Sequence, residues 1–118
     1  MAEYCRGDVV YINRSSKENA GNHVISGTRP AVIVQNDVGN IHSPNLLVAY
    51  LTSKLKKIEL PTHVLITCYE GLRPSIIQTE QLGTVDKRDV QGFVTHLRDE
   101  DVLRLDRALG ISVGLKAL

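Results

Sequence analysis

The feature of the sequence that most constrains the fold is a series of short apolar runs, separated by turn-forming residues at roughly ten-residue spacing. Such runs occupy residues 8–12, 31–35, 46–52, 63–67 and 75–79, and a shorter run follows at 83–85. Strands of this length and spacing are typical of a small barrel or sandwich, whereas an α/β sheet would need helical segments between them. We therefore expect a compact, strongly curved β-barrel, with a polar loop at 13–27 and a turn at 37–44.

The last quarter of the chain changes to the period of a helix. Val102, Leu105 and Leu109 lie at positions i, i+3 and i+7, so they share one face of a helix. Acidic residues at 99–101 suit the positive end of the helix dipole, and Gly110 stands where a C-terminal cap is expected. The predicted fold class is therefore α+β and mainly β, a small barrel with one C-terminal helix packed across it. Since the sequence contains no repeat, linker or low-complexity stretch, residues 1–118 are expected to form a single domain.

Composition and charge exclude several classes of protein. The net charge of +1 gives no overall attraction for polyanions, so a nucleic acid would have to be bound by a local patch. Cys5 and Cys68 form neither a disulfide framework nor a zinc spacing, which fits a reducing cytoplasm. The N-terminus has no secretion signal, and no run approaches the ~18 apolar residues of a membrane span. The four histidines are scattered, and nucleotide-binding loops are absent, so neither a metal nor another cofactor is expected.

An arginine stands directly in front of one of the most apolar runs, in the stretch GTRPAVIVQND at 27–37. Pro30 fixes its own φ and pushes Arg29 into an extended conformation, which orients the guanidinium before any ligand arrives. A guanidinium held in this way offers a planar fork to a phosphate or a carboxylate. A salt bridge at the start of a strand would explain the same arginine, so the residues alone leave both interpretations open.

Polar residues at the end of the run 46–52 have two interpretations as well. Thr52 fits simple β propensity, or it is a hydroxyl donor in a site. The three lysines that follow, Lys54, Lys56 and Lys57, form a basic cluster. A cluster of this size is either a solvated loop or a surface that follows a phosphate backbone.

An ordered set of short motifs suggests a family. The set consists of RGDVV at 6–10, GTRPAVIVQND at 27–37, SP at 43–44, LTS at 51–53, LPTHV at 60–64, EQ at 80–81, TVDK at 84–87 and ALGIS at 108–112. From about residue 5 to 115 the chain resembles the MazF/PemK family of toxin endoribonucleases, and LPTHV and TVDK look most like the toxins of low-GC Gram-positive bacteria. The resemblance implies an SH3-like barrel and a homodimer. It also implies a cytoplasmic bacterial toxin that cleaves single-stranded RNA without a metal and is neutralised by a MazE-like antitoxin, through which it would also bind operator DNA.

The resemblance also implies roles for particular residues. Arg29 and Thr52 correspond to the catalytic pair of the family. Asn36, Ser53 and Gln81 lie in matching stretches and are expected to contact bases or sugars of the RNA, while Lys54 and Lys56 are expected to bind its backbone. In such a site the 2′-hydroxyl of the RNA attacks the neighbouring phosphorus, and a fixed guanidinium and a hydroxyl stabilise the charge that develops.

The sequence departs from the family pattern at two places. Members of this branch usually carry a loop like Gly-Ser-Glu-Gln-Gly before the arginine, whereas here residues 20–27 read AGNHVISG and Glu18 is the nearest preceding carboxylate. His23 is a candidate substitute for that carboxylate. Gly83 stands where an arginine is common. Both changes fall where target choice is expected to be set, so no recognition sequence is carried over.

Two other functions share the predicted barrel. One is a toxin of the CcdB type, which binds DNA gyrase and has no enzymatic activity. The other is an SH3-like module that only binds a peptide or a nucleic acid. A gyrase-binding toxin needs neither the pair of Arg29 and Thr52 nor the lysine cluster beside it, so these residues favour the ribonuclease.

Overall fold

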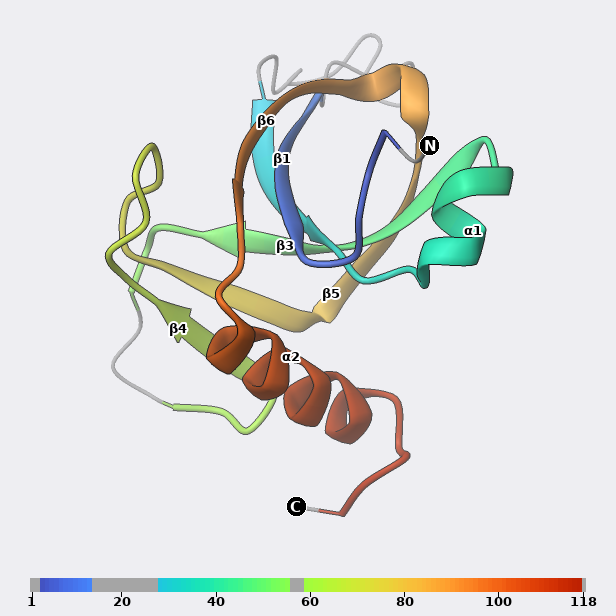
Figure 1. Ribbon diagram of the computed structural model, residues 1–118. Coiled ribbons are helices and arrows are strands. Elements are labelled where there is room, and N and C mark those ends of the chain that lie inside the picture. The colour runs from blue at the N-terminus through green and yellow to red at the C-terminus, as the bar shows by residue number, and fades with distance from the viewer. Residues whose placement is uncertain (1–2, 14–27, 56–58, 118) are drawn as a thin grey trace, which may run out of the picture.

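The computed structural model describes residues 3–13, 28–55 and 59–117 (Figure 1). Six strands, two α-helices and one 3-10 helix occupy this part of the chain. In chain order they are β1 (Asp8–Asn13), β2 (Thr28–Ile33), α1 (Asp37–His42), β3 (Asn45–Thr52), β4 (His63–Ile66), β5 (Ser75–Asp86), η2 (Lys87–Asp89), β6 (Val90–His96) and α2 (Asp99–Ser112). Within the described residues no helix is long and apolar enough to cross a membrane.

The six strands form one antiparallel sheet in the order β4-β5-β3-β2-β1-β6. The sheet curls strongly, and the long strand β5 sweeps across it (Figure 1). The register of β5 against β3 shifts between the pairs Leu51–Ile77 and Ala49–Leu82, and such an irregularity bends a strand. In the described part of the chain β4 and β6 do not pair with each other, so the predicted barrel is a curled sheet that does not close. The predicted class, mainly β with a C-terminal helix, is confirmed.

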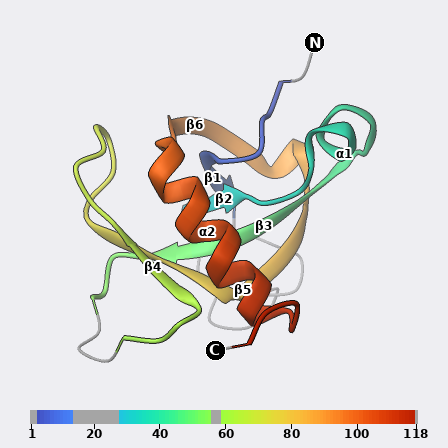
Figure 2. The ribbon, with the colours of Figure 1, turned by 60° about the horizontal axis from the view of Figure 1, so that its bottom comes forward.

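Each face of the sheet carries a buried apolar cluster, which explains why the apolar runs are nearly continuous. One core cluster, containing Val9 and Val32, lies under α2 and includes Leu105 of that helix. The other cluster, containing Val10 and Ile33, lies on the opposite face, inside the curl. Neighbouring strand residues point to opposite faces, so Val9 and Val10 enter different clusters, as do Val32 and Ile33. Figure 2 shows α2 lying across the sheet.

The helix α2 begins at Asp99 and buries the predicted face, with Leu105 fully buried. The expectation that Gly110 caps the helix is wrong. Gly110 is buried inside α2, and the left-handed residue after the helix is Gly114, with φ of +83°. The backbone N–H of Leu115 donates to the carbonyl of Gly110 at 2.7 Å, so the chain folds back over that glycine. A cap must follow the last helical turn, and here the helix continues for two residues beyond Gly110.

Three other local predictions are corrected by the structure. The segment 37–44, predicted as a turn, contains the short helix α1. The runs 75–79 and 83–85 belong to one strand, β5. Strand β6 was not predicted, because its sequence VQGFVTH mixes polar residues and a glycine and gives no clear period. It exists because it pairs with β1 at one end of the sheet.

Candidate active site

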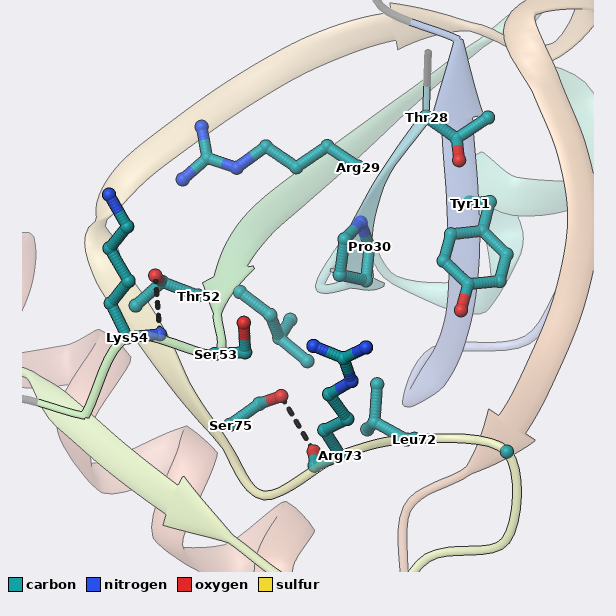
Figure 3. Close-up of a pocket in the computed structure, with 12 residues that line it drawn as sticks. Tyr11, Thr28, Arg29, Pro30, Thr52, Ser53, Lys54, Leu72, Arg73 and Ser75 are labelled. Atoms are coloured by element: carbon teal, nitrogen blue, oxygen red, sulfur yellow. Dashed lines mark hydrogen bonds between the residues drawn. The ribbon is translucent and has the colours of Figure 1, made fainter.

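A pocket of about 770 Å³ opens where β2, the end of β3 and the segment before β5 meet (Figure 3). Its lining comprises Tyr11, Thr28, Arg29, Pro30, Leu51, Thr52, Ser53, Lys54, Gly71, Leu72, Arg73 and Ser75. The antiparallel pairing of β2 with β3 brings Arg29 near Thr52, Ser53 and Lys54. The structure therefore gathers four of the predicted site residues in one pocket.

Arg29 is half-buried in β2 and contacts one side chain of β5 and one of β3. Its Nη2 atom donates a hydrogen bond of 3.4 Å to Oε1 of Gln78. Its guanidinium carbon lies 4.9 Å from the centre of the Tyr50 ring, within the range of a cation–π contact. Within the described residues, these two contacts help to fix the orientation of the guanidinium.

Thr52 ends β3, and its hydroxyl oxygen accepts a hydrogen bond of 3.1 Å from the backbone N–H of Lys54. A hydroxyl has one proton to donate and two lone pairs. Because the backbone occupies a lone pair, the proton of Thr52 remains available to a ligand in the pocket. The same local turn places Ser53 and Lys54 on the lining (Figure 3).

The pocket is cationic, although the whole chain carries a net charge of only +1. Among the described residues, its charged lining residues are Arg29, Lys54 and Arg73, and none of the described lining residues is acidic. Clustering of one sign of charge in a concave surface concentrates the field there and attracts anions. This is the local patch that the composition requires of a protein that binds a polyanion.

The remaining predicted residues lie elsewhere. Asn36 caps α1, where its side-chain oxygen accepts a hydrogen bond of 2.8 Å from the N–H of Gly39. Gln81 is exposed at the bend of β5 and does not line the pocket. Lys56 and His23, like Lys57, lie outside the described residues. The roles of Asn36 and Gln81 in binding RNA stay predictions.

Sequence reasoning missed three residues of the site. Gln78 and Tyr50 contact Arg29 and left no signal in the sequence, because their positions depend on strand register. Arg73 did leave a signal, since Arg73-Pro74 repeats the arginine-proline step of Arg29-Pro30.

Gly83 lies against the Tyr50 ring that contacts Arg29. A Cβ atom at this position would lie 2.9 Å from Cε2 of Tyr50, closer than real Cβ contacts come. The missing side chain therefore leaves room for the ring that stacks against Arg29. The departure at Gly83 and the orientation of the pocket arginine are thus physically linked.

The fold and the pocket together define a small β-rich protein with a cationic pocket of a charge that suits an anionic ligand. A family model described as PemK-like, MazF-like toxin of type II toxin-antitoxin systems matches residues 5–113. Endoribonuclease EndoA of Bacillus subtilis (strain 168) is 40% identical over 112 residues, which cover 93% of this chain and 94% of the relative. The chain belongs to the PemK-like, MazF-like toxin family.

Solved structures agree in fold. An endoribonuclease in complex with its cognate antitoxin from a mycobacterial species matches with a TM-score of 0.77 and 20% identity, over 98% of this chain and 99% of that chain. A MazE–MazF complex from Deinococcus radiodurans matches with a TM-score of 0.78 and 17% identity, over 96% and 97%. Together with the family match, these results favour the ribonuclease toxin over a gyrase-binding toxin or an SH3-like binding module.

Proposed function

We propose that this protein cleaves single-stranded RNA at selected sequences without a metal ion, using Arg29 and Thr52. The protein is an endoribonuclease toxin of a type II toxin-antitoxin system. One observation supports the proposed site above all others. A guanidinium in contact with Gln78 and Tyr50, and a hydroxyl whose proton can be donated, line the same cationic pocket.

In the proposed reaction, the 2′-oxygen of a ribose attacks the adjacent phosphorus, and the bond from phosphorus to the 5′-oxygen breaks. The products are a 2′,3′-cyclic phosphate and a 5′-hydroxyl. One proton leaves the nucleophile and one joins the leaving oxygen, so no water is consumed. Because the nucleophile belongs to the substrate, the protein has to align it and to stabilise charge on the phosphoryl oxygens.

The roles follow from the chemistry of each group. Arg29 stabilises the charge that develops on the phosphoryl oxygens, since a guanidinium with pKa above ~12 is a poor acid or base near neutrality. Thr52 donates a second hydrogen bond to the same oxygens. Ser53 and Lys54, with Lys56 beyond the described part, bind the sugar and the backbone, and bases are read outside the pocket by residues such as Asn36 and Gln81.

Partners are part of this proposal. A MazE-like antitoxin with an acidic, partly apolar tail would fold onto the toxin and cover the cationic pocket, and the structural relatives include complexes with antitoxins. We further propose that the toxin acts in the cytoplasm as a homodimer. Binding to operator DNA would go through the antitoxin.

RNA cleavage is expected to survive EDTA. Within the part of the chain that the structure describes, the residues that line the pocket include no carboxylate, imidazole or thiol, which are the side chains that would hold a catalytic metal. Purified protein incubated with a long mixed-sequence RNA in EDTA should cut at a small set of sites, and the upstream products should end in a cyclic phosphate. A magnesium-dependent nuclease in the same buffer is the control and should be inactive. Activity that disappears on chelation and returns with magnesium would overturn the proposed mechanism.

Replacing Gly83 by alanine is expected to lower the single-turnover cleavage rate about two- to fivefold, the equivalent of one exposed cation–π contact. The new Cβ atom would displace the Tyr50 ring and loosen Arg29. Gly92→Ala is the matched control, because Gly92 also lies in a strand and a Cβ there meets no atom within 4 Å. Equal rates for Gly83→Ala and Gly92→Ala would refute the link between Gly83 and Arg29.

A further inference from the structure

Arg73 is the charged residue of the pocket to which the proposed reaction assigns no role. Its side chain is exposed, and within the described residues its guanidinium has no hydrogen-bond or ion-pair partner. Figure 3 shows it pointing into the pocket between Ser53 and Tyr11, while Arg29 extends toward Thr52 and Lys54. The two guanidinium groups therefore lie at different ends of one pocket.

The backbone around Arg73 is fixed before any ligand binds. Pro74 restricts the conformation of Arg73, as Pro30 does for Arg29. The hydroxyl of the buried Ser75 donates a hydrogen bond of 2.8 Å to the carbonyl of Arg73. On the other side, Leu72 packs against the core, and its N–H donates to the carbonyl of Tyr69 at 3.2 Å.

The loop that carries Arg73 is also tied to α2. The Tyr69 hydroxyl donates to Asp101 at 2.5 Å, and burial together with this bond raises the pKa of Tyr69, so the phenol keeps its proton. The Arg98 guanidinium donates to the carbonyls of Thr67 and Cys68 at 2.9 and 3.1 Å. A cation presented by an anchored loop costs less entropy to hold against a ligand than one on a mobile loop.

We propose that Arg73 binds a phosphate of the RNA backbone next to the one that is cleaved. This inference rests on the proposed function, because it takes the phosphate between Arg29 and Thr52 as the scissile one. Arg73 then acts in binding and alignment, and Arg29 acts on the transition state. A guanidinium suits this task because its fork matches two phosphate oxygens.

The test is a double-mutant cycle between Arg73 and single phosphates of the substrate. The probe is an oligoribonucleotide that spans one mapped cut site, with a 2′-deoxy sugar at that site to prevent cleavage. A set of derivatives replaces one phosphate at a time by an uncharged methylphosphonate. With the unmodified protein, replacing the phosphate beside the cut site should weaken binding about tenfold. Arg73→Ala should weaken binding of the parent oligonucleotide by a similar factor. Binding by this variant should no longer respond to a methylphosphonate beside the cut site, but it should still respond to one at the other phosphates.

A control variant and the salt dependence of binding complete the test. Arg107→Ala removes one exposed positive charge from α2, away from the pocket, and should keep the full sensitivity at every phosphate. The slope of log affinity against log salt should fall by about one for Arg73→Ala. If the protein cleaves RNA but Arg73→Ala keeps the same sensitivity at all phosphates, the role of Arg73 is refuted and the proposed function stands. If the unmodified protein neither binds nor cleaves RNA, both the role of Arg73 and the proposed function are refuted.

Discussion

Arg29→Ala is expected to lower the rate constant for RNA cleavage at saturating RNA by about 10²–10³-fold or more, while RNA affinity changes little. The charge that Arg29 meets is larger in the transition state than in the bound substrate, so its loss should act on turnover. The residue is well placed for this, because its guanidinium lines the cationic pocket and is held there by contacts with Gln78 and Tyr50. Single-turnover rates and equilibrium binding to the 2′-deoxy oligonucleotide separate the two effects.

Arg29→Lys and Lys54→Ala are the comparisons for this result. A lysine keeps the charge but lacks the planar fork, so Arg29→Lys should recover only part of the rate. Lys54→Ala should behave in the opposite way, with weaker binding, a flatter salt dependence and nearly normal cleavage once saturated. If Arg29→Ala cleaves at the normal rate at saturation, Arg29 is a docking residue and the catalytic assignment is wrong.

Thr52→Val is expected to lower the same rate constant by about 10²-fold, the usual cost of one lost donor to a developing oxyanion. Valine keeps the branched shape and the β propensity of threonine but has no proton to donate. Thr52→Ser keeps the hydroxyl, which can still accept from the N–H of Lys54, so most of the activity should remain. Comparison of the two variants therefore separates the effect of the Thr52 hydroxyl on cleavage from the effect of the side-chain shape on the strand. Equal cleavage rates for the two variants would show that the Thr52 hydroxyl takes no part in the reaction.

The sequence by itself determined the elements whose signal is local and strong. The apolar runs predicted β1 to β5, because each face of the sheet carries a buried apolar cluster and neighbouring residues of a run therefore both tend to be apolar. The helix α2 was visible because Val102, Leu105 and Leu109 repeat at the period of a buried helical face. The C-terminus of α2 was predicted too early, because a glycine can pack inside a helix as well as cap it. Only the chain that folds back at Leu115 distinguishes these two cases.

The candidate site could be predicted in part. Arg29 could be singled out because the proline that follows it restricts the backbone locally, and the order of motifs then assigned Thr52 to the same site. Arg73 carries the same local signal, yet its place in the pocket depends on how the loop before β5 is tied to α2.

Tertiary structure alone decided which residues meet across strands. The register shift of β5 places Gly83 against Tyr50 and Gln78 beside Arg29, and no local pattern encodes a register between strands distant in sequence. The same holds for β6, whose mixed sequence becomes a strand only because β1 offers its free edge. Local sequence restricts a backbone to strand or helix through sterics and burial. The geometry of a site made from several strands depends on pairing energies that are summed over the whole sheet.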